Sequence, residues 1–186
     1  MLSFKGFLAV LITAAVLSVP LYFYWGFLTR GMSPSASTLR LNQLETDGVP
    51  DFTLPDLNGH PVSLSQFKNT PILVNLWASW CAPCVKEFPS LMRLVQHFNG
   101  KLVILAVSHD HNREDLDSFI KAFGAVPEHF VIVWDQDRKT SDLLGTDQLP
   151  ETYILDRDHK MVRKIAGEQL WDVPGALDFF STKLGI

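Results

Sequence analysis

The chain has 186 residues, of which 47% are hydrophobic and 19% charged, and its formal net charge is −4. This length supports one ordinary domain with an appendage, and only 11 Gly and 11 Pro exclude a collagen-like or low-complexity chain. The mildly acidic balance gives no reason to expect a nucleic-acid partner. Two cysteines are too few for a disulfide-stapled scaffold or a four-ligand zinc site.

The first 30 residues differ in composition from the rest of the chain. No charged residue occurs between Gly6 and Thr29. A helix of residues 7–28 would be about 33 Å long, enough to cross a hydrocarbon core about 30 Å thick. Aromatic rings that suit the lipid–water interface lie near its far end, at Tyr22, Tyr24 and Trp25. We therefore expect residues 1–30 to form an uncleaved, single-pass membrane anchor.

Two other interpretations of this segment stay open. A cleaved signal peptide has a shorter apolar region, about 7–15 residues, and a small-residue cleavage site. The nearest such site here, residues 35–37, lies well past the apolar run. A buried core helix should show a polar face, which this run lacks. Positive charges flank both ends, so the positive-inside rule gives almost no preference of orientation.

Residues 31–38 predict a flexible linker, and residues 39–186 predict a globular domain in which strand and helix patterns alternate. The expected strands cover residues 52–54, 61–64, 71–78, 102–107, 130–134, 152–155 and 161–165. Helical spacing predicts helices that include residues 88–98, 116–123 and 177–184. The last helix has Asp172 as its expected N-cap and Pro174 in its first turn. This order predicts an α/β sandwich with a mixed sheet.

The two cysteines, Cys81 and Cys84, are spaced C-x-x-C where a buried strand passes into a helix. Backbone N–H groups at a helix N-terminus stabilise a thiolate, so the pKa of the first thiol should fall. Such a thiolate attacks disulfides readily. Cys84 lies one turn further along, close enough to form a disulfide with Cys81, and should be the more buried, resolving thiol.

Other interpretations of the cysteine pair are weaker. Half of a zinc site would need a second pair, and His97 alone does not complete one. A haem-attachment motif would need histidine where Val85 stands. His109 and His111 lie at alternate positions past a strand end, but no third metal ligand is evident. Two inert buried thiols stay possible, although C-x-x-C beside a βαβ pattern favours a redox pair. We therefore expect no metal and no cofactor.

The segment 77–84, WASWCAPC, and the following Pro89 resemble the thioredoxin superfamily. The resemblance covers about residue 49 to the C-terminus and is strongest to the membrane-anchored TlpA/ResA branch, close to the cytochrome c maturation protein CcmG (DsbE). It implies a thioredoxin-like three-layer sandwich with a mixed sheet, an N-terminal β-hairpin, a helix–strand insertion at residues 110–134 and one N-terminal transmembrane helix. Asn75 stands where thioredoxins proper carry a buried Asp.

The same resemblance implies roles for residues near the cysteines. Glu87 matches an active-site acid and lies one helical turn past Cys84, where it could accept a proton from that thiol. An ordinary surface glutamate is the alternative. Pro150 matches the cis-proline that opens the strand facing the cysteine pair, whereas a trans turn proline is the commoner case. Residues expected to contact substrate are Trp80, Leu149, Pro150 and Glu151, although Glu151 could simply be solvated.

The resemblance implies a membrane-tethered thiol-disulfide oxidoreductase that acts as a reductant outside the cytoplasm. Its domain would face the periplasm from the inner membrane. The implied substrate is apocytochrome c, and the implied electron donor is a transmembrane thiol carrier of the DsbD or CcdA kind. Alternatives are a general or copper-site disulfide reductase and a non-catalytic docking or chaperone module. An oxidant is disfavoured because Ala82-Pro83 lacks a histidine, and a peroxidase because no Pro-x-x-x-Thr-x-x-Cys pattern occurs.

Overall fold

The computed structural model describes residues 16, 18–27 and 35–186. Most of the expected anchor, residues 1–30, lies outside these residues, and residues 18–27 are helical. No helix within the described ranges is long and apolar enough to cross a membrane. Residues 31–34 of the expected linker also lie outside them. The remaining linker residues differ from expectation, because helix α2 (Ala36–Thr46) begins at Ala36.

The chain divides into two compact units, Met1–Leu39 and Arg40–Ile186, and the second holds a five-stranded sheet of order β5-β4-β3-β6-β7. Strands β3, β4 and β5 run parallel, whereas β6 is antiparallel to β3 and β7 to β6. The sheet strands are β3 (Ile72–Trp77), β4 (Val103–Ser108), β5 (Phe130–Trp134), β6 (Glu151–Leu155) and β7 (Met161–Ala166). A separate hairpin pairs β1 (Thr53–Pro55) with β2 (Pro61–Ser63). The predicted mixed sheet and hairpin are confirmed.

Burial explains why the sequences of the central strands are nearly continuous apolar runs. Every residue of β3 and β4 is buried, since both strands lie inside the sheet and both of its faces are covered. The edge strand β7 instead exposes part of its length. The insertion at residues 110–134 contributes α4 (Arg113–Phe123) and places β5 at the opposite edge of the sheet.

The helices begin and end at recognisable capping residues. Helix α3 (Ala82–Phe98) has Cys81 as its N-cap and ends at Asn99 in the left-handed conformation. Helix α6 (Pro174–Leu184) begins at a proline, as predicted, but its N-cap is Val173. The expected N-cap, Asp172, was wrong: its carboxylate is held by Arg93, with Oδ2 at 2.5 Å from Nε. Two short helices were not predicted, α5 (Lys139–Leu144) and a 3₁₀ turn (Leu64–Phe67).

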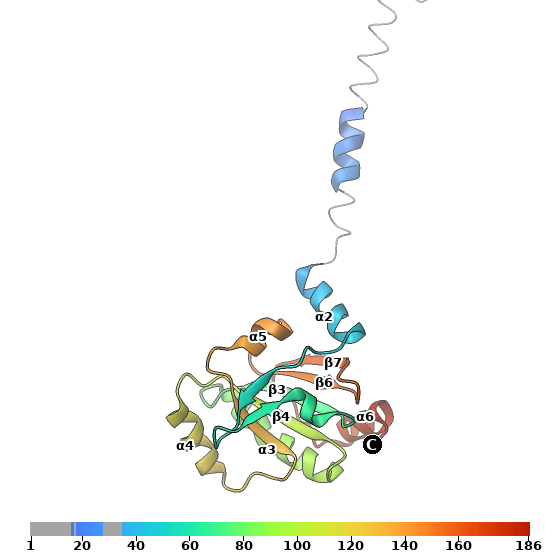
Figure 1. Ribbon diagram of the computed structural model, residues 1–186. Helices are drawn as coiled ribbons and strands as arrows, with labels where there is room; N and C mark the ends of the chain where they lie inside the picture. The colour runs from blue at the N-terminus through green and yellow to red at the C-terminus, as the bar shows by residue number, and fades with distance from the viewer. Residues whose placement is uncertain (1–15, 17, 28–34) are drawn as a thin grey trace, which may run out of the picture. The chain divides into compact units, whose positions relative to one another are not determined.

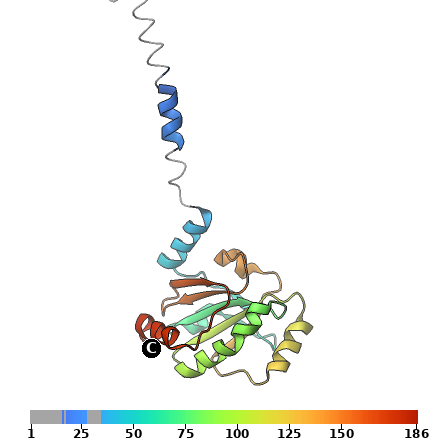
Figure 2. The same cartoon turned by 180° about the vertical axis from the view of Figure 1, so that it is seen from behind.

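The sheet is the middle of three layers. One core lies between the sheet and helices α3, α4 and α6, and it contains both cysteines. The second core lies on the other face, beneath α5, the 3₁₀ turn and the C-terminal part of α2. Alternation along β6 divides its side chains between them, with Ile154 in the first core and Tyr153 and Leu155 in the second. Figures 1 and 2 show the two faces in turn.

Candidate functional site

The cysteine pair lies at the junction between β3 and α3. Cys81 and Cys84 form a disulfide with an S–S length of 2.05 Å and a Cα–Cα distance of 5.3 Å. The backbone N–H of Cys84 donates to Cys81 Sγ at 3.3 Å. Once the disulfide is reduced, this N–H and the helix N-terminus favour a thiolate on Cys81. Cys81 is 6% exposed and Cys84 is fully buried, as expected for an attacking and a resolving thiol.

Buried polar contacts hold the turn that precedes Cys81. The fully buried Asp110 carboxylate accepts hydrogen bonds from the backbone N–H of Ser79 at 3.1 Å and from Ser79 Oγ at 2.6 Å. The next residue, Trp80, is 53% exposed, and its ring stacks on His111 with 5.9 Å between ring centroids. The turn is therefore anchored on one side and presents an aromatic surface beside the cysteine pair.

The loop before β6 contributes the second part of the site. The Leu149–Pro150 peptide bond is cis, as predicted. The Pro150 carbonyl accepts a hydrogen bond from the backbone N–H of Gly167 at 2.9 Å. Leu149 is half-buried and Pro150 is buried.

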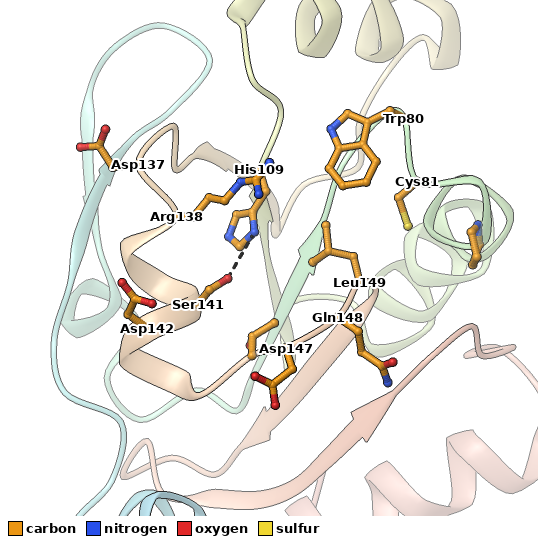
Figure 3. Close-up of a pocket in the computed structure, with 12 residues that line it drawn as sticks. Trp80, Cys81, His109, Asp137, Arg138, Ser141, Asp142, Asp147, Gln148 and Leu149 are labelled. Atoms are coloured by element: carbon orange, nitrogen blue, oxygen red, sulfur yellow. Dashed lines mark hydrogen bonds between the residues drawn. The ribbon is translucent and has the colours of Figure 1, made fainter. Parts of the chain in front are cut away.

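A pocket of about 600 Å³ joins these pieces, since Trp80, Cys81 and Leu149 all line it. Figure 3 shows Trp80 and Cys81 on one side of this pocket and α5, which carries Ser141 and Asp142, on the other. Three of the predicted substrate-contacting or catalytic residues therefore share one pocket. The contribution of α5 was not predicted, because a helix of six residues gives almost no periodic signal.

His109 lines this pocket and is almost completely buried. Its Nε2 lies 3.2 Å from Thr140 Oγ1 and 3.7 Å from Asp135 Oδ2, and its Nδ1 lies 3.4 Å from Ser141 Oγ. Burial lowers the pKa of His109 below its usual value, although the Asp135 carboxylate opposes this. A neutral imidazole with a hydroxyl at each nitrogen fits these distances.

His109 and His111 do not converge on a common point. His111 lies against Trp80 and 3.3 Å from an Arg138 guanidinium nitrogen, whereas His109 contacts Thr140 and Ser141. Among the residues that the structure describes, no group of three His, Cys, Asp or Glu side chains could hold a metal ion.

Glu87 lies on the buried face of α3, one turn beyond Cys84, and is 1% exposed. Its Oε1 accepts a hydrogen bond from Asn75 Nδ2 at 2.9 Å. Its Oε2 accepts from the Gln169 backbone N–H at 3.1 Å and from Trp171 Nε1 at 3.2 Å. Burial raises the pKa of Glu87 above its usual value, and the three N–H donors oppose that rise. Glu87 is therefore not the surface glutamate that spacing alone left possible.

Asn75 connects this acid to the strand that follows the cis-proline. It is fully buried in β3 and lies opposite Thr152 of β6. Its Nδ2 donates both to Glu87 and to Thr152 Oγ1, each at 2.9 Å. Asn75 Oδ1 is buried and has no hydrogen-bond partner among the described residues.

Glu151 is buried as well, but the structure does not bring it to the cysteine pair. Its Oε2 lies 2.9 Å from Lys164 Nζ and accepts a hydrogen bond from the Tyr153 hydroxyl at 3.1 Å. Tyr153 belongs to the core on the far face of the sheet from Cys81. Because side chains alternate along a strand, Glu151 shares that far face, whereas Thr152 points toward Asn75.

Comparison with known proteins agrees with this architecture. The sequence profile of the AhpC/TSA family matches residues 46–164. The thiol-disulfide oxidoreductase ResA of Bacillus subtilis (strain 168) is 33% identical over 124 residues, which cover 66% of this chain and 68% of that protein.

Many solved structures share the fold. A Chlorobium tepidum protein that carries the provisional description thiol:disulfide interchange protein DsbE aligns with a TM-score of 0.62 and 26% identity, over 73% of this chain and 92% of that one. A thiol-disulfide oxidoreductase from Bacteroides fragilis aligns with a TM-score of 0.59 and 27% identity, over 70% and 97% of the two chains. The predicted thioredoxin-like fold is confirmed. With its C-x-x-C disulfide at the start of α3, the chain belongs to the AhpC/TSA family and is a thioredoxin-like thiol-disulfide oxidoreductase of the ResA type.

Proposed function

We propose that this protein is a membrane-tethered reductase that acts outside the cytoplasm on the disulfide of apocytochrome c before haem is attached. The single observation that carries the proposal is the pairing of a reachable Cys81 with a buried Cys84, one turn from the buried acid Glu87. The ResA relatives and the DsbE-like structure support the class of reaction. The uncharged segment within residues 1–30 supports the tether and the location in the cytoplasmic membrane.

The proposed reaction begins from the reduced protein. The Cys81 thiolate attacks one sulfur of the substrate disulfide, that S–S bond breaks, and the leaving substrate thiolate takes a proton from solvent. Cys84 then gives its proton to the Glu87 carboxylate and attacks Cys81 Sγ in the mixed disulfide. This second step breaks the mixed disulfide, forms the Cys81–Cys84 disulfide and releases the second substrate sulfur as a thiolate, which takes a proton from solvent. Two electrons thus pass from the protein to the substrate.

The pocket beside Cys81 is the proposed docking site. Trp80 offers an exposed ring, and Leu149 of the loop before β6 lines the same pocket as Cys81. The cis-proline Pro150 directly follows Leu149. A substrate chain that docks there would place its disulfide against the attacking sulfur. Glu151 has no part in this contact in our proposal, because Lys164 and Tyr153 already engage it on the other face of the sheet.

The direction of electron flow follows from the loop between the cysteines. Ala82 and Pro83 carry no positive charge that would stabilise a thiolate strongly enough to make the pair an oxidant. The oxidised protein then needs a dithiol donor, for which we propose a transmembrane thiol carrier of the DsbD or CcdA kind. A tether keeps the domain near such a donor and raises its effective concentration.

The test is the equilibrium reduction potential of the Cys81–Cys84 pair in the full-length protein, measured in glutathione or dithiothreitol buffers. We expect a value near −270 mV or somewhat above it, whereas a value near about −120 mV would mean an oxidant and contradict the proposal. Substrate preference is tested with an oxidised C-x-x-C-H peptide. A matched C-x-x-C-A peptide and oxidised glutathione serve as controls. Equal rates on all three would favour a general reductase instead.

A further inference from the structure

The loop between β7 and α6 supplies two of the three hydrogen bonds to Glu87. Trp171 is 3% exposed, and its indole Nε1 donates to Glu87 Oε2 at 3.2 Å. The Gln169 backbone N–H donates to the same oxygen at 3.1 Å. Trp171 lies more than 80 residues after Glu87 in the sequence.

Further hydrogen bonds anchor this loop to the site. The Trp171 backbone N–H donates to Ser90 Oγ at 3.2 Å, and Ser90 Oγ donates to the Glu87 carbonyl at 2.7 Å. At its other end, the Gly167 N–H donates to the Pro150 carbonyl at 2.9 Å. The Trp171 ring packs near Phe180 of α6, with 6.3 Å between centroids. The indole donor is therefore held in place by its backbone and by its ring.

All three groups that face the Glu87 carboxyl are N–H donors, which stabilise the ionised carboxylate and not the protonated acid. No cation lies within ion-pairing distance of Glu87 among the described residues. Glu168, in the same loop, is the charged neighbour of Glu87, and its negative charge raises the pKa of Glu87. Glu168 Oε2 itself lies 3.5 Å from Lys86 Nζ. Cys84, on the same helix, is the other group that titrates once reduced. The ionised form of Glu87 therefore depends on neutral hydrogen bonds.

We infer that Trp171 is a positioning residue, whose indole N–H holds the Glu87 carboxylate ionised and turned to receive the proton that leaves Cys84 when its sulfur attacks the mixed disulfide. The inference rests on the proposed function, because it gives Glu87 that proton-accepting role. It adds that the β7–α6 loop, remote from the C-x-x-C motif in sequence, sets the pH range in which the resolving step runs.

The test is the substitution Trp171→Phe in the full-length protein, which keeps an aromatic ring in the core and removes the donor. The Glu87 carboxyl is followed directly by carbon NMR of protein labelled at glutamate, with its signal assigned by its loss in Glu87→Gln. Loss of one hydrogen bond to a charged group should move the Glu87 midpoint upward by about one pH unit. The midpoint for turnover of an oxidised peptide should move by the same amount.

Trp134→Phe is the matched control. It also removes one indole donor, which reaches the Asp110 backbone carbonyl at 2.9 Å, but it leaves every Glu87 contact in place. We expect it to leave the Glu87 midpoint where it is in the native protein. An unchanged midpoint in Trp171→Phe, or an equal shift in Trp134→Phe, would overturn the inference.

Two further variants keep the inference testable: Ser90→Ala if Trp171→Phe does not fold, and Glu87→Gln to separate the inference from the proposed function. If Trp171→Phe does not fold, Ser90→Ala removes the acceptor of the Trp171 N–H and should shift the midpoint in the same direction by less. Turnover separates the two hypotheses. If Glu87→Gln has the native pH profile, the proposed role of Glu87 fails and this inference fails with it. If Glu87→Gln abolishes the pH dependence but Trp171→Phe does not move it, only the inference fails.

Discussion

Glu87 and Glu151 are both buried glutamates, and they lie on opposite faces of one sheet. Glu151 has a cation beside it, Lys164 Nζ at 2.9 Å, and the Tyr153 hydroxyl as a second partner. Burial lowers the pKa of Lys164, but its hydrogen bonds to Glu151 and Tyr153 outweigh this and raise it, so the ammonium stays charged. Glu87 has only neutral N–H donors, and burial raises its pKa.

The difference shows that burial alone does not assign a carboxylate to the chemistry. A buried carboxylate next to an ammonium is a closed ion pair, and taking up a proton would leave the cation without its partner. A buried carboxylate held by amide and indole N–H groups can gain or lose a proton without leaving a neighbouring charge unpaired. Only the second arrangement lies on the face of the sheet that carries Cys84.

The strongest test of this comparison removes the attacking sulfur from the α3 face. Cys81→Ser should abolish reduction of an oxidised peptide, because no other thiol in the described domain is exposed enough to attack. Cys84→Ser should still attack and should accumulate a mixed disulfide, since no resolving thiol remains. Mass spectrometry of the quenched reaction checks both. Turnover by Cys81→Ser would place the chemistry elsewhere.

Substitution of each glutamate sharpens the contrast in rate. Glu87→Gln should slow the resolving step about 10²-fold at neutral pH, the usual contribution of a positioned proton acceptor. Glu151→Gln should leave that step within a few fold of the native rate. Single-turnover decay of the mixed disulfide measures both variants. Similar losses in the two would mean that the face of the sheet does not decide the role.

For the free energy of unfolding, the larger effect should come from Glu151 and not from Glu87. Glu151→Gln leaves the partly buried Lys164 ammonium without its partner and should lower the free energy of unfolding by about 1–3 kcal/mol. Adding Lys164→Met should recover much of that loss, since the uncompensated charge is removed. Denaturant unfolding of the single and double variants measures this. A double variant less stable than the single one would contradict the ion-pair interpretation.

The smallest expected effect is a pH dependence carried by Glu87. Its pKa in the folded protein is raised above the usual 4.5, so its contribution to stability is fully present below pH 4.5 and is lost as the pH rises through the raised value. The unfolding free energy of the native protein, minus that of Glu87→Gln, should therefore fall with rising pH in that window. Its slope should be at most about 1.4 kcal/mol per pH unit. If this difference in unfolding free energy rises with pH instead, the pKa of Glu87 is lowered in the folded protein and the prediction is wrong.

Most of the domain was predictable because its signals are local. Apolar runs marked β3 and β4, helical spacing marked α3, α4 and α6, and turn residues marked the hairpins. Two of the failures have a local reason, a short segment in one and a competing contact in the other. Helix α5 has six residues, and Asp172 pairs with Arg93 instead of capping α6. The burial of Glu87 could not be read from spacing, because it depends on a loop more than 80 residues away.

The sequence by itself determined the cysteine pair and its place at a strand–helix junction, since spacing and hydrophobic pattern extend over only a few neighbouring residues. It also determined that Pro150 precedes a strand. Only the tertiary structure decided which carboxylate lies on the face of the sheet that carries the cysteine pair. Loop packing brings Trp171 to Glu87, and strand alternation points Asn75 toward Glu87 and Glu151 toward Lys164. Hydrogen bonds and ion pairs between distant segments exist only in the folded chain, and they decide whether a buried carboxylate is held by neutral N–H donors or by a cation.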